Sequence, residues 1–157
     1  LLETEQDAIF ATVLFILLDL ESNTFTIANA GHQPPMVTSS RFEGISELDD
    51  ATAVALGVVP DMVYPQEVYQ LVPGDVVLLY TDGINEAMNR AQDEYGMTRL
   101  KQVVTSGPAE SKAVVQRVIS DLRRFVGGAA QSDDQTLLAF GVSARLSGEV
   151  DLNTTQS

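Results

Sequence analysis

Short β-rich segments separated by turn residues fill the first half of this chain, and they limit its fold more than any other feature. Residues 9–19 are rich in β-branched and aromatic side chains, which predicts a long buried strand. After a turn at residues 21–23, residues 24–30 alternate between polar and apolar side chains, as a half-buried strand does. Because strands joined by so short a turn run antiparallel, these segments predict a β-hairpin.

A second hairpin is expected around Pro73 and Gly74. Proline presets φ at the first central position of a type II turn, and glycine accepts the positive φ at the second. The flanking residues 64–71 and 76–81 predict the two strands, the second of them buried. Weaker strand patterns and one small-residue loop complete this half: residues 36–38, 45–48 and 51–60.

Helical patterns dominate the second half. An apolar stripe at helical spacing predicts a helix over residues 110–126, and a glycine pair ends it. Shorter helices are expected at residues 84–89 and 98–105, and a last strand at 135–142. Hairpins followed by helices and one more strand predict an α+β fold of sheet layers with helices outside. The apolar-poor residues 144–157 predict a disordered tail.

The charge is strongly acidic and unevenly placed. The chain has 22 acidic and 9 basic residues, a net charge of −13, and residues 1–89 hold only one base, Arg41. This balance argues against nucleic-acid binding. No apolar run approaches the length of a membrane span, and the absence of cysteine fits a cytoplasmic protein. The acidic half is either a solvated surface or the source of carboxylates that hold a cation.

Two carboxylate motifs stand next to buried strands. Asp82 and Gly83 follow the strand at 76–81, and Asp133 and Asp134 precede the strand at 135–142. Taken alone, the first motif is more simply a plain turn with aspartate as a helix cap, and the second is more simply a solvated loop before the strand. Together they supply the oxygen ligands that Mg²⁺ or Mn²⁺ prefers.

Other catalytic motifs are weak or absent. His32, the single histidine, excludes a multi-histidine metal centre, and a structural, hydrogen-bonded role is the simpler interpretation of it. The sequence has no Gly-x-Ser-x-Gly elbow and no phosphate-binding loop that ends in Gly-Lys-Ser/Thr. A serine hydrolase and a nucleotide hydrolase of those types are therefore not supported.

An ordered set of short motifs carries a family resemblance. The set runs through Phe10-Ala11-Thr12, Asn29-Ala30-Gly31-His32-Gln33-Pro34, Leu56-Gly57, Pro73-Gly74-Asp75, Tyr80-Thr81-Asp82-Gly83, Glu86-Ala87, Tyr95-Gly96 and Asp133-Asp134-Gln135-Thr136. In this order and spacing it resembles the SpoIIE/RsbU-like branch of the PPM-type metal-dependent serine/threonine protein phosphatases. The resemblance covers roughly residues 8–142.

The resemblance implies a fold, a cofactor and a reaction. It implies a layered antiparallel β-sandwich flanked by helices (αββα) and a binuclear Mn²⁺ or Mg²⁺ centre. Asp82 and Asp133 would be metal ligands, Gly83 would shape the loop around them, and Asp134 would support the centre where the wider family has asparagine. A metal-activated water, and no catalytic side chain, would hydrolyse phosphoserine on a regulatory protein such as an anti-anti-sigma factor.

One family motif has no match here. An earlier strand of the family carries an Asp-Gly motif that bridges the two metals, so residues 1–143 are expected to be a partial domain without its N-terminal strands and helix. Such a chain would be inactive alone, and exposed sheet would favour a homodimer. The alternative to a phosphatase domain is a non-catalytic interaction domain of the same fold in a partner-switching pathway. A receiver or sensor domain upstream is also expected.

Overall fold

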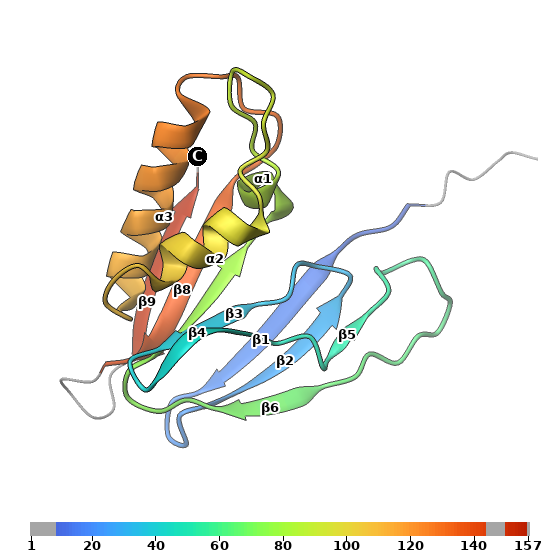
Figure 1. Ribbon diagram of the computed structural model, residues 1–157. Coiled ribbons are helices and arrows are strands. Elements are labelled where there is room, and N and C mark those ends of the chain that lie inside the picture. The colour runs from blue at the N-terminus through green and yellow to red at the C-terminus, as the bar shows by residue number, and fades with distance from the viewer. Residues whose placement is uncertain (1–8, 144–149, 157) are drawn as a thin grey trace, which may run out of the picture.

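Two β-sheets pack face to face, and helices cover the outer face of the second sheet (Figure 1). The structure, a computed structural model, describes residues 9–143 and 150–156. The α+β class with two mainly antiparallel sheets is confirmed. Within the described residues the helices lie on one outer face of the sandwich, whereas the αββα arrangement has helices on both.

The first sheet is built around the predicted first hairpin. Its strands are β1 (Val13–Asp19), β2 (Thr24–Ala30), β5 (Thr52–Ala53) and β6 (Glu67–Gln70). β1 and β2 pair antiparallel from Asp19 opposite Thr24 to Val13 opposite Ala30, which confirms the hairpin. Two short strands pair with different parts of β2, β6 antiparallel and β5 parallel.

The second sheet is antiparallel throughout. In spatial order its strands are β4 (Phe42–Glu47), β3 (Met36–Ser39), β7 (Asp75–Tyr80), β8 (Thr136–Val142) and β9 (Val150–Gln156). β7 lies in the middle, between β3 and β8, and is buried on both faces. Its unbroken apolar sequence is what such a position requires.

The helices are α1 (Asp82–Asn85), α2 (Met97–Thr105) and α3 (Ser111–Val126). α3 buries the predicted stripe and ends at Gly127, which takes the left-handed conformation with φ of 57°. α1 begins two residues earlier than predicted, and it ends at Asn85 because the carbonyls of Asn85 and Ala87 accept hydrogen bonds from the N–H groups of Gly96 and Tyr95. No helix in the described part of the chain is both long and apolar enough to cross a membrane.

Alternation along β7 and β8 divides the interior into two cores. On β7, Val76, Leu78 and Tyr80 pack toward the helices, while Val77 and Leu79 pack toward the first sheet. β8 contributes in the same way, with Leu137 and Ala139 on the helix side and Phe140 on the sheet side. The two faces of one sheet therefore hold the three layers together.

The predicted second hairpin is wrong. The turn itself is present, since the N–H of Asp75 donates to the carbonyl of Val72 at 3.0 Å and Gly74 has φ of 95°. However, β6 pairs with β2 in the first sheet and β7 pairs with β3 and β8 in the second. The Pro73-Gly74 turn therefore carries the chain from one sheet to the other.

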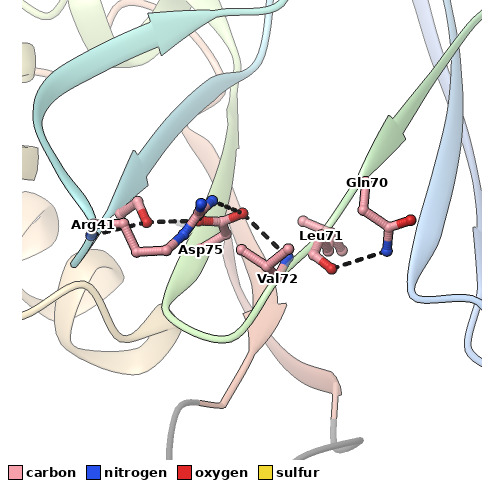
Figure 2. A network of polar contacts seen from close by, with 6 residues as sticks. Arg41, Gln70, Leu71, Val72 and Asp75 are labelled. Atoms are coloured by element: carbon pink, nitrogen blue, oxygen red, sulfur yellow. Dashed lines mark hydrogen bonds and ion pairs between the residues drawn. The ribbon is translucent and has the colours of Figure 1, made fainter.

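A buried carboxylate holds this corner in place, as Figure 2 shows. Asp75 accepts hydrogen bonds from the hydroxyl of Ser39 at 2.6 Å and from Nη2 of Arg41 at 2.9 and 3.0 Å. It also accepts from the N–H of Val72 at 3.2 Å. These donors come from the end of β3, from the β3–β4 turn and from the chain before β7, so they favour a corner between sheets over a hairpin.

The predicted long buried strand at residues 9–19 is also wrong in part. The strand begins at Val13, and its burial alternates. Leu14, Ile16 and Leu18 pack into the sandwich, whereas Phe15 and Leu17 are 59% and 60% exposed. No described helix or strand covers the outer face of the first sheet, so alternate apolar residues of β1 remain in solvent.

Residues 150–156, expected to lie in a disordered tail, form β9. They pair with β8 along its full length, from Val150 opposite Val142 to Gln156 opposite Thr136. Backbone pairing with an open strand edge stabilises a segment of low apolar content, which the compositional argument did not consider. Residues 144–149 and 157 of the expected tail, and residues 1–8, lie outside the described residues.

Candidate functional site

Asp82 lies where β7 ends and α1 begins. Thr81 has extended backbone angles, φ −87° and ψ 158°, and Asp82 is the first helical residue. Its side chain is exposed, and its Oδ1 accepts a hydrogen bond from the N–H of Gly83 at 3.1 Å. The carboxylate is therefore placed at a sheet edge, with its remaining acceptor positions open to solvent.

Asp133 and Asp134 lie in the loop that enters β8, and both are exposed. Oδ1 of Asp133 accepts from the N–H of Asp134 at 2.7 Å. The carbonyl of Asp133 accepts from Nε2 of Gln131 at 2.9 Å. Local hydrogen bonds thus fix the course of the loop before the strand begins.

Thr81 joins these two loops. Its hydroxyl donates to the carbonyl of Asp134 at 2.9 Å and accepts from the N–H of Thr136 at 3.0 Å. Its N–H donates to the carbonyl of Thr136 at 3.1 Å. The backbone and side chain of Thr81 therefore extend the β7–β8 contact one residue past the end of β7, to Thr136 and to Asp134 in the loop before β8.

Gly83 allows a close approach of the same loops. A Cβ placed on Gly83 would lie 2.5 Å from the carbonyl oxygen of Asp134 and 3.0 Å from its carbonyl carbon. Only a residue without a side chain fits against this backbone. The structure thus brings Asp82 and Gly83 next to Asp133 and Asp134, while the roles expected for all four residues stay predictions.

The donor set only partly fits a divalent cation. Exposed carboxylates and nearby carbonyls are the hard oxygen ligands that Mg²⁺ and Mn²⁺ take. Among the described side chains, those of residues 9–143, however, no three from His, Cys, Asp or Glu gather closely enough to hold a metal ion. The carboxylate oxygens are ligands of the type that suits Mg²⁺. Their number falls short of the roughly six ligands that Mg²⁺ demands.

Asn85 was missed by the sequence analysis. It follows Asp82 by three residues on α1, which places the two on neighbouring helix positions. Asn85 is 7% exposed, and its Oδ1 has no hydrogen-bond partner among the described residues. A polar residue between the apolar Ile84 and Ala87, close behind an Asp-Gly motif, is the signal that could have identified it.

Tyr80 lies just before the site in the sequence and belongs to the core on the helix side of the second sheet. It is the last residue of β7, and its hydroxyl donates to Sδ of Met97 at 3.7 Å. Burial, with a smaller contribution from the charge of Glu47, raises the pKa of Tyr80 to about 12. The side chain is therefore neutral at physiological pH and adds no charge behind Asp82.

Asn29 and His32 form a separate, structural unit. Asn29 is fully buried, and its side-chain amide donates to the carbonyl of His32 at 2.9 Å and accepts from its N–H at 2.8 Å. The same amide donates to Thr52 Oγ1 at 3.2 Å, which ties the end of β2 to β5. The imidazole of His32 forms a hydrogen bond of its own, between Nδ1 and the carbonyl of Gln33 at 3.0 Å, as expected for a structural histidine.

Comparison with known proteins places the chain among phosphatase domains. The family model described as "Stage II sporulation protein E (SpoIIE)" matches residues 1–143. Protein IcfG of Synechocystis is 28% identical over 132 residues, 84% of this chain and 20% of that protein. Phosphoserine phosphatase RsbU of Bacillus subtilis is 31% identical over 79 residues, 50% of this chain and 23% of that protein.

A solved structure, the SiaA-PP2C domain of Pseudomonas aeruginosa, has the same fold. The TM-score is 0.70 at 21% identity, over 87% of this chain and 53% of that one. The chain thus spans about a fifth of the length of the curated relatives it matches and about half of the solved domain.

Proposed function

Since this chain belongs to the SpoIIE family of PPM-type protein phosphatases, we propose that it forms part of a metal-dependent phosphoserine phosphatase site. Asp82 and Asp133 are the proposed metal ligands, and Gly83 and Asp134 shape the loops that carry them. The observation that carries the proposal is the direct contact of the two loops through Thr81 and Gly83.

Each of these residues has a distinct proposed role. Asp82 and Asp133 would hold Mn²⁺ or Mg²⁺, and the cation would supply Lewis acidity toward water and the phosphoryl oxygens. Thr81 would hold the two loops together, because its hydroxyl donates to the carbonyl of Asp134 and accepts from the N–H of Thr136. Both carboxylates are exposed, so a phosphorylated side chain of another protein has access to them.

The ligand count limits what this chain does alone. Two carboxylates bind one hard cation weakly, and water must complete its shell. We therefore expect weak metal binding and slow turnover from residues 1–157, with a second cation requiring ligands from outside the described residues. The substrate class proposed is phosphoserine on a bacterial regulatory protein of the anti-anti-sigma type, because RsbU is a phosphoserine phosphatase by name.

Calorimetric titration with Mn²⁺ tests the proposal. Saturable heat is expected for the wild-type chain and is expected to vanish in Asp82→Asn and Asp133→Asn. Glu43→Gln, which removes an exposed carboxylate of β4, is the matched control and should bind as wild type does. Equal Mn²⁺ affinity in the wild type and both site variants would contradict the assignment.

A second candidate function is a non-catalytic interaction domain of the same fold. The absence of a three-ligand cluster in the described residues and the open apolar face of β1 favour it. Such a domain would show no saturable Mn²⁺ binding and no release of phosphate from phosphoserine peptides. It would still bind a regulatory protein, and neither Asp82→Asn nor Asp133→Asn would weaken that binding.

A further inference from the structure

A cavity of about 290 Å³ lies beside the loop that carries Asp133. Its walls come from the segment after α1, the last turns of α3 and residues 128–135. The apolar part of the wall consists mainly of Ala87, Met88, Leu122, Val126 and Ala130. Its size and composition suit one aliphatic side chain.

Two arginines stand at this cavity. Arg123 lines it directly. Arg90 reaches over Gly128, another lining residue, since a Cβ placed on Gly128 would lie 3.1 Å from Nη2 of Arg90. Both side chains belong to exposed residues. We call this site, with its two guanidinium groups, the arginine cavity.

These two arginines are uncommitted. Among the described side chains, those of residues 9–143, neither the Arg90 nor the Arg123 guanidinium takes part in a hydrogen bond or an ion pair. By contrast, Arg41, Arg99 and Arg124 each pair with an aspartate. In a chain with a net charge of −13, two free guanidinium groups at one cavity attract an anion that the acidic surface elsewhere repels.

The turn that carries Arg90 is held in a fixed shape. Oδ1 of Asn89 accepts from the N–H groups of Ala91 and Asp93 at 2.8 and 2.9 Å, and Nδ2 of Asn89 donates to Asp93 at 3.0 Å. The N–H of Asn89 also donates to the carbonyl of Asp93 at 3.0 Å. The backbone at Arg90 is thus ordered before any ligand binds, which lowers the entropic cost of binding.

The cavity is connected to the candidate metal site. Gln131 and Ser132 line it, and Nε2 of Gln131 donates to the carbonyl of Asp133 at 2.9 Å. A peptide whose phosphorylated serine lies at Asp82 and Asp133 would therefore have its neighbouring residues within reach of the arginine cavity.

We propose that the arginine cavity binds the substrate phosphoprotein through an aliphatic side chain and an adjacent acidic side chain, both close to the phosphoserine. The aliphatic group fills the apolar pocket, and the acidic group meets Arg90 and Arg123. This assignment rests on the proposed phosphatase function and adds the substrate features that the site selects.

Fluorescence anisotropy with labelled phosphoserine peptides tests this on the whole chain. One ten-residue peptide carries Leu and two Glu beside the phosphoserine, and a second carries Leu and two Lys. The acidic peptide should bind at least about tenfold more tightly than the basic one. Charge reversal by Arg90→Glu with Arg123→Glu should invert this preference.

Lys112→Glu is the matched control. Lys112 is an exposed cation of the first turn of α3, about 16 Å from Arg123 along the helix. The Lys112→Glu substitution changes the net charge without touching the cavity, so the preference for the acidic peptide should persist. Ala130→Trp, which fills the apolar pocket, should weaken the binding of both peptides. Thermal melts followed by circular dichroism verify that each variant is folded.

Two results would overturn the proposal. One is equal affinity of the wild type for the two peptides, or no detectable binding of either. The other is a loss of acidic preference in Lys112→Glu as large as in the arginine variants. Asp82→Asn separates this inference from the metal assignment, since it should abolish Mn²⁺ binding and leave the preference for the acidic peptide.

Discussion

The hydroxyl of Thr81 donates a hydrogen bond to the carbonyl of Asp134, 53 residues further along the chain. The same oxygen accepts from the N–H of Thr136. One side chain thereby connects the loop after β7 with the loop before β8, and each loop carries a candidate ligand. We therefore expect the relative position of Asp82 and Asp133 to depend on this contact.

Thr81→Val tests that dependence. Valine keeps the shape and removes the hydroxyl, which leaves a carbonyl and an N–H to find water. We expect a loss of about 1–2 kcal/mol in the free energy of unfolding. Mn²⁺ affinity should fall about tenfold, as when an outer-shell partner of a metal ligand is lost. Urea denaturation and calorimetry measure the two effects.

Thr105→Val is the control for Thr81→Val. The hydroxyl of Thr105 bonds only to the preceding helical turn, at Lys101 and Gln102, so its loss should leave Mn²⁺ affinity unchanged. Equal metal affinity in both valine variants would show that the Thr81 contact does not position the ligands.

Gly83→Ala should separate the two loops. The new Cβ would overlap the carbonyl of Asp134, so the backbone must move at a cost of about 1–3 kcal/mol. Gly44→Ala is the comparison, because Gly44 has φ of 93° but no atom within 4 Å of its Cβ position. Both variants should lower stability in urea, and only Gly83→Ala should weaken Mn²⁺ binding. Unchanged metal binding in Gly83→Ala would argue against a shared site.

The outer face of β1 should bind hydrophobic probes. Phe15 and Leu17 point away from the sandwich and are 59% and 60% exposed. Replacing both with serine should lower the fluorescence of the dye ANS and any self-association seen by analytical ultracentrifugation, with a stability change within about 0.5 kcal/mol.

Phe25→Ser provides the contrast, because Phe25 is 1% exposed and packs between the sheets. That variant should raise ANS fluorescence through partial unfolding. If the double variant Phe15→Ser with Leu17→Ser destabilised the protein as strongly as Phe25→Ser does, the outer face of β1 would have to be covered in solution. The homodimer expected from the sequence stays a prediction that the same ultracentrifugation experiment addresses.

Acid should weaken the contact between α2 and α3. Hydrogen bonds from Arg99, followed by one from Tyr95, lower the pKa of Asp121 below its usual value of 3.8, against the opposing effect of burial. A carboxylate with a depressed folded-state pKa contributes stability above pH 3.8, and this contribution disappears as the pH falls through the folded-state value.

Asp121→Asn should therefore lower the free energy of unfolding at pH 7 by about 1–2 kcal/mol. The difference from wild type should shrink as the pH falls below 3.8 and through the lowered folded-state pKa of Asp121. Urea denaturation at several pH values gives both curves. A constant difference across this range would mean that Asp121 contributes no pH-dependent stability.

Local patterns in the sequence predicted most of the elements. The strand at residues 24–30 and the helix over residues 110–126 lie where their periodicity placed them, because period 2 and period 3.6 are properties of neighbouring residues. The same holds for the Pro73-Gly74 turn, whose φ preferences are intrinsic to these two residues. The α+β class follows from the order of such elements.

Which of those strands and helices pack against one another was determined only by the tertiary structure. The turn at Gly74 was predicted, but Ser39 and Arg41 bind Asp75 and send the next strand into another sheet. Likewise, no local pattern distinguishes a strand covered on both faces from β1, or a tail from β9. Burial and edge pairing depend on what other segments are present.

The candidate site also combines features that the sequence predicted with features that only the tertiary structure determined. The residue types alone indicated that Asp82 and Asp133 could serve a hard cation, since chemistry belongs to the side chain. Their proximity, the contact of Gly83 with Asp134 and the two free arginines beside the cavity arise from the antiparallel pairing of β7 with β8 and from the packing of α3. Contacts between residues far apart in the chain depend on the sum of many packing energies, and no short stretch of sequence contains that sum.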